Sequence, residues 1–171
     1  RRGLPVVILG PHGVGKRQLA LCAWSHSHRA WKEFEEVACA QRSREAAHAR
    51  LFGAAPGALE GRSERLQGAV ERANGGVVFL DEVDALDPAT QYALLRFLET
   101  REYEPLGGGH RRFSDVHMVC ASVRDLRAEV QRGAFREDLW YRLAGRVVEV
   151  PPLRDRPEDV DAFLQARSLS A

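Results

Sequence analysis

A glycine-rich turn between an apolar run and a helical segment sets the first limit on the fold. Residues 5–9 predict a buried strand, and residues 10–16, Gly-Pro-His-Gly-Val-Gly-Lys, match the pattern G-x-x-x-x-G-K at the start of a predicted helix. Glycines let the backbone curl so that several N–H groups point at phosphate oxygens, while the helix N-terminus and the lysine favour negative charge. The sequence therefore predicts a phosphate-binding loop made of Gly10, Pro11, His12, Gly13, Val14, Gly15 and Lys16.

Short apolar runs alternate with helical segments along the chain, a pattern typical of a parallel sheet covered on both faces. The predicted strands are residues 5–9, 34–39, 77–80, 116–121 and 147–150, and the predicted helices include residues 43–52, residues 64–73 and one that begins at Pro88. A length of 171 residues with 44% hydrophobic residues fits one domain over residues 1–171. The prediction is a three-layer α/β/α fold with five parallel strands.

Composition limits the partners and the compartment. No apolar run approaches the roughly 18 residues that a membrane span needs, and a net charge of +1 argues against a polybasic nucleic-acid arm. The cysteines at positions 22, 39 and 120 lack metal-ligand spacing and cannot all pair. We interpret them as reduced, buried thiols of a cytoplasmic protein with no membrane partner.

An acidic pair follows the most apolar of the predicted strands. Residues 77–80 deliver Asp81 and Glu82 to the carboxyl end of the strand, where open α/β sheets bind their ligands. Asp81 is predicted to hold Mg²⁺, directly or through water, and Glu82 to orient a water molecule for in-line attack on a γ-phosphate. Asp84 and Asp87 are assigned to the following turn and helix cap.

Two details refine the predicted ligand. Arg17 stands where such loops usually carry a Ser or Thr that holds Mg²⁺, and an arginine places positive charge beside the metal site without ligating a cation. Either another group holds the metal, or magnesium binding is weak. Guanine recognition in GTPases needs an Asn-Lys-x-Asp segment, and Lys32, the only lysine outside the loop, lacks it. The sequence thus favours ATP together with Mg²⁺.

Three later segments resemble the AAA+ domain of bacterial enhancer-binding proteins, the sigma-54 interaction domain of NtrC-like transcriptional regulators. Residues 75–83, G-G-V-V-F-L-D-E-V, are similar to G-G-T-L-F-L-D-E-I in that family. Residues 135–143, F-R-E-D-L-W-Y-R-L, are similar to F-R-E-D-L-Y-Y-R-L, and residues 151–156, P-P-L-R-D-R, to P-P-L-R-E-R. The resemblance runs from Gly10 to about Val160. It implies the AAA+ form of the P-loop NTPase fold.

The resemblance also implies an assembly. Members of this family form hexameric rings with ATP between neighbouring subunits, and Arg136 and Arg142 match the paired arginines that reach into the neighbour's site. A guanidinium supplied in this way neutralises charge on the γ-phosphate, an effect typically worth about 10³-fold or more in rate. The alternative is a structural ion pair with Glu137 or Asp138.

The chain departs from the family in the loop that contacts sigma-54. The family's G-A-F-T-G-A corresponds here to Gly57, Ala58, Leu59, Glu60, Gly61 and Arg62. The glycines remain, whereas the aromatic residue is a leucine and two charged residues, Glu60 and Arg62, stand at the tip. Because desolvating these charges without partners is costly, productive contact with sigma-54 is predicted to be lost.

Two asparagines of the family are missing as well. The asparagine that restrains the catalytic glutamate aligns with Ala38, and the sensor asparagine aligns with Val123. Coupling between nucleotide state and loop movement is therefore expected to suffer more than binding. The family's helical lid, receiver domain and DNA-binding helix-turn-helix have no counterpart in residues 1–171. The sequence predicts an α/β core truncated before the lid, which meets DNA only through a domain outside this chain.

Two main hypotheses follow. The first is the ATPase core of a sigma-54-dependent transcriptional regulator, in which Glu82 activates water and Arg136 and Arg142 complete the neighbour's site. The second is a nucleotide-binding regulatory module with little hydrolysis, which the altered loop and the missing asparagines favour. The intact acidic pair and both arginines favour the first. A P-loop small-molecule kinase, a third alternative, fits the acidic pair and the arginines less well.

Overall fold

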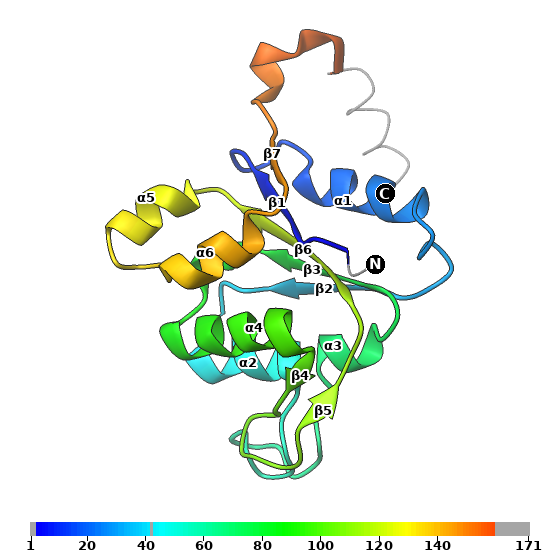
Figure 1. Cartoon of the computed structure of the whole chain (residues 1–171), viewed down its shortest axis with the longest axis vertical. Helices are drawn as coiled ribbons and strands as arrows, with labels where there is room; N and C mark the ends of the chain where they lie inside the picture. The colour runs from blue at the N-terminus through cyan, green and yellow to red at the C-terminus, as the bar shows by residue number, and fades with distance from the viewer. Residues whose placement is uncertain (1–2, 42, 160–171) are drawn as a thin grey trace.

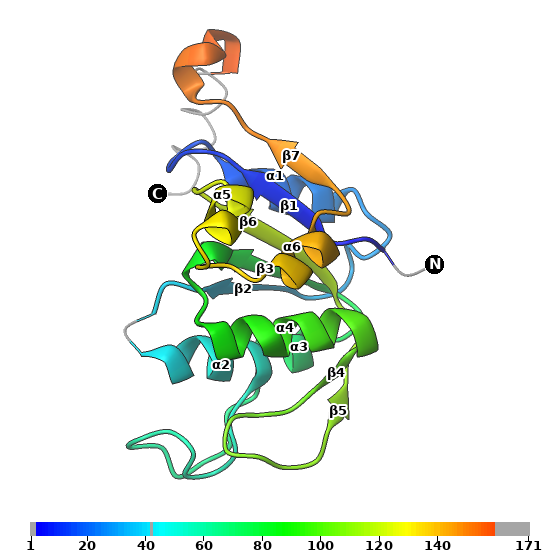
Figure 2. The same ribbon diagram turned by 60° about the vertical axis from the view of Figure 1, so that its left-hand side comes forward.

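The computed structural model describes residues 3–41 and 43–159, which form a five-stranded parallel sheet between helical layers (Figure 1 and Figure 2). The strand order is β2-β3-β6-β1-β7, and every neighbouring pair is parallel. The strands are β1 (Val6–Leu9), β2 (Phe34–Ala38), β3 (Val77–Asp81), β6 (His117–Ser122) and β7 (Val147–Glu149). The predicted three-layer fold and its five parallel strands are confirmed.

Helices connect these strands and cover both faces of the sheet. They are α1 (Lys16–Ser25), α2 (Arg44–Phe52), α3 (Ala69–Arg72), α4 (Pro88–Thr100), α5 (Leu126–Gln131) and α6 (Glu137–Leu143). Helix α1 lies on one face, and α2 to α6 lie on the other (Figure 1). Asp87 caps α4 as predicted, since its carboxylate accepts hydrogen bonds from the N–H groups of Ala89 and Thr90, and Pro88 fills the first helical position.

Alternate side chains of β3, an interior strand of the sheet, enter two separate cores. Val78 and Leu80 pack with residues of α2 to α6, whereas Val77 and Phe79 pack with Ala20 of α1. All four strand side chains are buried, which explains why this segment reads as a continuous apolar run rather than an alternating one. The strand therefore presents its first polar residues only at its carboxyl end.

Two loops extend beyond α2 and α4, on the side of the sheet that faces away from α1 (Figure 2). Residues 53–68 and 104–111 are joined at their base, where the N–H of Ala55 donates to Leu106 at 2.8 Å and the N–H of Leu106 donates to Gly53 at 2.9 Å. The predicted partner loop, residues 57–62, forms the tip of the first of these loops. A bond from the N–H of Arg62 to the carbonyl of Leu59, at 3.0 Å, closes its turn.

The structure corrects several expectations. The helix predicted at residues 64–73 covers only Ala69–Arg72, because the backbone of Leu66 pairs instead with Ala54 at 2.9 and 3.0 Å. The strands β4 (Glu102–Tyr103) and β5 (Arg112–Phe113) form a small antiparallel sheet that was not expected from the sequence. Cys22 is exposed rather than buried.

The predicted single domain spans residues 1–171, of which residues 1–2, 42 and 160–171 lie outside the described part of the chain. Over residues 3–41 and 43–159, no helix combines the length and the apolar character that crossing a membrane requires.

Candidate functional site

The predicted phosphate-binding loop lies between the carboxyl end of β1 and the first turn of α1 (Figure 1). Gly15 has a φ of 92°, a left-handed conformation that side chains disfavour, and it is the N-cap of α1. The N–H groups of the first helical turn have no partners within a helix and carry the positive end of its dipole. The turn therefore offers the anion-binding geometry that the sequence predicted.

The loop and the acidic strand end meet in one pocket of about 230 Å³. Its lining residues are His12, Gly13, Gly15, Lys16, Arg17, Gln18 and Asp81. Gly10 and Pro11 contribute through their carbonyl groups, described below, and Val14 is buried.

Lys16 is folded against its own loop. Its Nζ donates to the carbonyl oxygens of Gly10 at 2.8 Å and Pro11 at 2.9 Å, and the side chain is buried. Burial lowers the pKa of Lys16, while the negative charge of Asp81 and Glu82 opposes that shift. The acidic pair thus helps to keep a buried ammonium charged beside the pocket.

The acidic pair is held by the backbone at the end of β3. The carboxylate of Asp81 accepts a hydrogen bond from the N–H of Glu82 at 3.1 Å. Glu82 has φ 56° and ψ 51°, a left-handed conformation that costs a non-glycine residue of order 1 kcal/mol or more. Its carboxylate lies 3.9 Å from Nδ1 of His12, so Glu82 reaches across from the strand to the loop. Such strain is found disproportionately at functional sites.

The donor set at this pocket fits Mg²⁺. This ion keeps several water ligands and is usually held by one or two carboxylates together with substrate phosphates. Asp81 supplies a pocket-lining carboxylate. No group of three or more histidine, cysteine or carboxylate side chains in the described ranges is arranged to enclose a metal ion. A metal here would therefore depend on Asp81, phosphate oxygens and water.

Arg17 lines the pocket as expected, but its charge is paired. Its guanidinium contacts both carboxylate oxygens of Glu36 on β2, with Nε 2.8 Å from Oε2 and Nη2 2.6 Å from Oε1. The pairing with Glu36 was not predicted from the sequence, because the two residues are 19 positions apart and on different elements. The positive charge predicted beside the metal site is thus neutralised by a carboxylate from the neighbouring strand.

Arg136 and Arg142 lie away from this pocket in their own subunit. Arg136 donates to both oxygens of Asp138, at 3.0 and 2.7 Å, and its guanidinium lies 5.4 Å from the ring centre of Tyr92. Arg142 donates to the carbonyl of Leu98 in the last turn of α4 at 2.9 Å. The ion pair considered as an alternative role for Arg136 is therefore present within the subunit, whereas Arg142 caps a helix end.

The two positions without the family's asparagines lie at the carboxyl edge of the sheet. Ala38 is in register with Asp81, and Val123 directly follows β6. Beside Val123, the hydroxyl of the buried Ser122 donates to Asp84 at 2.7 Å. Asp84 was expected to serve the turn after β3, and the structure instead ties its side chain to the end of β6. This bond restrains the acidic segment from the next strand.

The segment after β7 returns to the phosphate-binding loop. Arg156 donates from Nη2 to the carbonyl of Val14 at 2.5 Å and from Nε to the carbonyl of Pro151 at 3.2 Å. The motif at residues 151–156 supported the family resemblance, but its contact with the loop was not predicted. The contact spans 142 positions in sequence.

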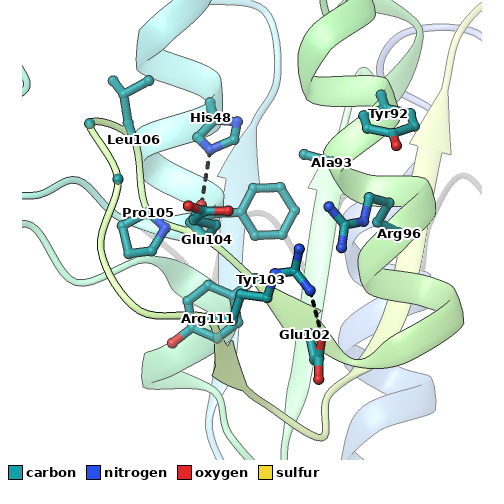
Figure 3. Close-up of a pocket in the computed structure, with 13 residues that line it drawn as sticks. His48, Tyr92, Ala93, Arg96, Glu102, Tyr103, Glu104, Pro105, Leu106 and Arg111 are labelled. Carbon is teal, nitrogen blue, oxygen red and sulfur yellow. Dashed lines mark hydrogen bonds and ion pairs between the residues drawn. The ribbon is translucent and has the colours of Figure 1, made fainter.

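A separate cavity of about 290 Å³ lies at the base of the two long loops (Figure 3). The residues that line it include Phe52, Tyr103, Arg96 and Arg111. On one side, Nε2 of His48 lies 3.3 Å from the carbonyl oxygen of Glu104 (Figure 3), which ties α2 to the second loop. Burial lowers the pKa of His48, although the carbonyl opposes the shift, which favours a neutral imidazole at this contact.

Comparison with known proteins decides the family. The family described as the Sigma-54 interaction domain matches residues 1–149. This chain belongs to that family. Over 155 residues it is 42% identical to the alginate biosynthesis transcriptional regulatory protein AlgB of Pseudomonas aeruginosa, an alignment that covers 91% of this chain and 34% of AlgB. The chain spans about a third of the length of the curated relatives it matches.

Solved structures agree with the sigma-54 interaction domain fold. NtrX from Brucella abortus is 36% identical with a TM-score of 0.84, over 93% of this chain and 36% of NtrX. The same protein has been solved in complex with ATP, at 35% identity and a TM-score of 0.82 over 93% of this chain and 36% of that one. The P-loop NTPase domain of an E. coli sigma-54 transport activator shares the fold alone, at 15% identity and a TM-score of 0.58 over 88% and 84% of the two chains.

Proposed function

We propose that this sigma-54 interaction domain binds ATP with Mg²⁺ and hydrolyses the ATP between subunits of a ring, most simply a hexamer, as the AAA+ ATPase core of a transcriptional regulator. The observation that carries the proposal is the single pocket in which Lys16, Gly15 and Asp81 meet, with Glu82 at its edge. The complex of NtrX with ATP supports an adenine nucleotide as the ligand.

Binding of the triphosphate is assigned to the loop and the first turn of α1. Backbone N–H groups around Gly13 and Gly15 would donate to phosphate oxygens, and Lys16 would exchange its bonds to Gly10 and Pro11 for a phosphate contact. Asp81 would hold Mg²⁺ directly or through water. The ion, when bound, supplies positive charge that offsets the phosphate oxygens.

Hydrolysis is assigned to Glu82. Its carboxylate would accept a proton from a water molecule as the water oxygen bonds to the γ-phosphorus. The bond from that phosphorus to the bridging oxygen breaks, and ADP and inorganic phosphate leave. The left-handed backbone of Glu82 supports this role, because it turns the carboxylate from the strand end toward the loop.

Arg136 and Arg142 are assigned to the active site of a neighbouring subunit. Arg136 is the N-cap of α6 and bonds to Asp138, whereas Arg142 lies in α6 and bonds to Leu98 of α4. Neither lines the phosphate pocket of its own chain. Placed against a neighbour, a guanidinium would neutralise charge that builds on the γ-phosphate. Hydrolysis would then require assembly.

ATP turnover measured against protein concentration tests the proposal on the full-length protein. Turnover per subunit should rise with concentration, while Glu82→Gln should bind ATP without turning it over and Lys16→Ala should lose binding. Glu45→Gln, which changes an exposed carboxylate on α2, is the matched control and should behave as wild type. ATP binding without turnover at any concentration would contradict the ATPase proposal and favour a regulatory nucleotide-binding module.

A further inference from the structure

The ion pair between Arg17 and Glu36 is placed to control what reaches the phosphates. Arg17 is the second residue of α1 and lines the phosphate pocket. Both carboxylate oxygens of Glu36 contact the guanidinium of Arg17, which fixes the orientation of the planar group and offsets its positive charge. The pair joins the first turn of α1 to β2, across the face of the sheet that α1 covers.

Strand register shows the direction in which Arg17 is drawn. Ala38 of β2 lies beside Asp81, whereas Glu36 lies beside Phe79, two residues closer to the amino end of the strands. Two residues of strand correspond to about 6.6 Å. Glu36 therefore holds the guanidinium back along the sheet, away from the edge where Asp81 meets the pocket.

A released guanidinium would compete with the metal. Arginine presents several N–H donors in a planar fork that matches phosphate oxygens, and its charge repels a cation. Arg17 and Asp81 line the same pocket, so a released Arg17 would compete with Mg²⁺ for phosphate oxygens bound there. Glu36 neutralises this competitor while leaving Lys16 free to bind phosphate.

We propose that Glu36 is a positioning residue, which holds Arg17 away from the metal side of the phosphate pocket and so makes nucleotide binding depend on Mg²⁺. The inference rests on the proposed ATP binding. Glu36 would act only through Arg17 and is therefore not a catalytic residue. Its neighbour Glu35 provides a matched comparison, since it points to the opposite face of the sheet and pairs with Arg72 of α3 at 2.7 Å.

The test is calorimetric titration of the full-length protein with a non-hydrolysable ATP analogue, once with Mg²⁺ and once with EDTA. The quantity compared is the ratio of the two dissociation constants, EDTA over Mg²⁺. Glu36→Gln should lower this ratio at least fivefold, chiefly by tightening binding in EDTA. Glu35→Gln should leave it unchanged, and adding Arg17→Ala to Glu36→Gln should restore the wild-type ratio.

If the ion pair had only a structural role, its loss would weaken nucleotide binding equally in Mg²⁺ and in EDTA, and the ratio of dissociation constants would not change. A change in the ratio therefore distinguishes the positioning role from a structural one. A wild-type ratio in Glu36→Gln, with normal binding in Mg²⁺, would overturn the inference and leave the proposed function standing. No binding by the wild-type protein in either condition would overturn the proposed function, and the inference with it.

Discussion

The carboxylate of Asp138 accepts two hydrogen bonds from the guanidinium of Arg136, at 3.0 and 2.7 Å, within a single subunit. Arg136 is the N-cap of α6 and Asp138 lies in the first turn, where a negative charge also suits the helix dipole. The ring of Tyr92 on α4 lies against the guanidinium. The residue proposed to act on a neighbour's nucleotide is therefore held in a defined orientation before assembly.

This pair predicts how Asp138 titrates. The hydrogen bond from Arg136 holds the pKa of Asp138 below its ordinary 3.8. Arg136→Ala should raise that pKa toward 3.8, because the charged form loses its donor. NMR titration of the carboxyl carbon measures both values. Arg132→Ala is the control, since Arg132 pairs with Glu129 instead. An unchanged pKa of Asp138 in Arg136→Ala would show that the pair between Arg136 and Asp138 does not persist in solution.

The buried position of Lys16 predicts a limit on nucleotide binding at high pH. Burial lowers the pKa of Lys16 from 10.5, and the charge of Asp81 opposes the shift most. Affinity for ATP should therefore begin to fall at a pH below 10.5, as the ammonium loses its proton. Asp81→Asn should move the fall to still lower pH, because the charge that raises the Lys16 pKa is gone.

Binding of a fluorescent ATP analogue across pH 7 to 10.5 checks this expectation, measured in EDTA so that metal binding by Asp81 does not enter. The same midpoint in wild type and Asp81→Asn would contradict the electrostatic link between the strand end and the loop.

The backbone of Glu82 predicts an unusual order of stability among its variants. Glycine adopts a φ of 56° without strain, whereas alanine does not. Glu82→Gly should therefore be more stable than Glu82→Ala, by about 1 kcal/mol in the free energy of unfolding, even though glycine usually destabilises a folded chain. Urea denaturation of the two variants measures the difference. An alanine variant as stable as the glycine variant would show that the turn relaxes in solution.

The altered tip of the first long loop predicts the outcome of a sigma-54 capture experiment. Glu60 and Arg62 are both exposed at this tip, where docking would desolvate them. With ADP and aluminium fluoride bound, the native loop should not retain sigma-54 in gel filtration. The combined change Leu59→Phe, Glu60→Thr and Arg62→Ala should permit a complex, because it restores the apolar and hydroxyl contacts of the family loop.

Glu64→Thr, a charge removal just outside the six loop positions, should not permit that complex. A stable complex formed by the native loop would refute the expected loss of contact.

The sheet, the glycine-rich loop and the acidic end of β3 could be predicted because each depends on a pattern within a short segment of the sequence. Val77 to Leu80 is buried on both faces, so its apolar run is continuous, and the turn that begins at Gly10 follows a strand of the same kind. Parallel strands bring their carboxyl ends to one edge, so Asp81 had to lie near the loop even though 65 positions separate it from Lys16.

The contacts that the sequence did not reveal join distant residues on different elements. Two examples are the contact of Arg17 with Glu36 and that of Arg156 with Val14. These contacts depend on strand register and on how the chain folds back on itself, and local sequence periodicity carries no information about either. The shortened helix α3 has the same explanation, since Leu66 pairs with Ala54 across the first loop. The residues before Ala69 therefore do not form the helix that their sequence pattern predicts. A two-residue strand such as β4 is too short to leave a periodic signal.

Mixing two inactive variants tests most directly whether the site is shared between subunits. Glu82→Gln keeps Arg136 but lacks the proposed base, and Arg136→Ala keeps Glu82 but lacks the guanidinium. In rings assembled at random from equal amounts of the two, roughly a quarter of interfaces would pair an intact Glu82 with an intact Arg136. If the site is shared between subunits, ATP turnover of the mixture should rise to about that fraction of the wild-type rate. Turnover no greater than the mean of the two variants alone would contradict a shared site.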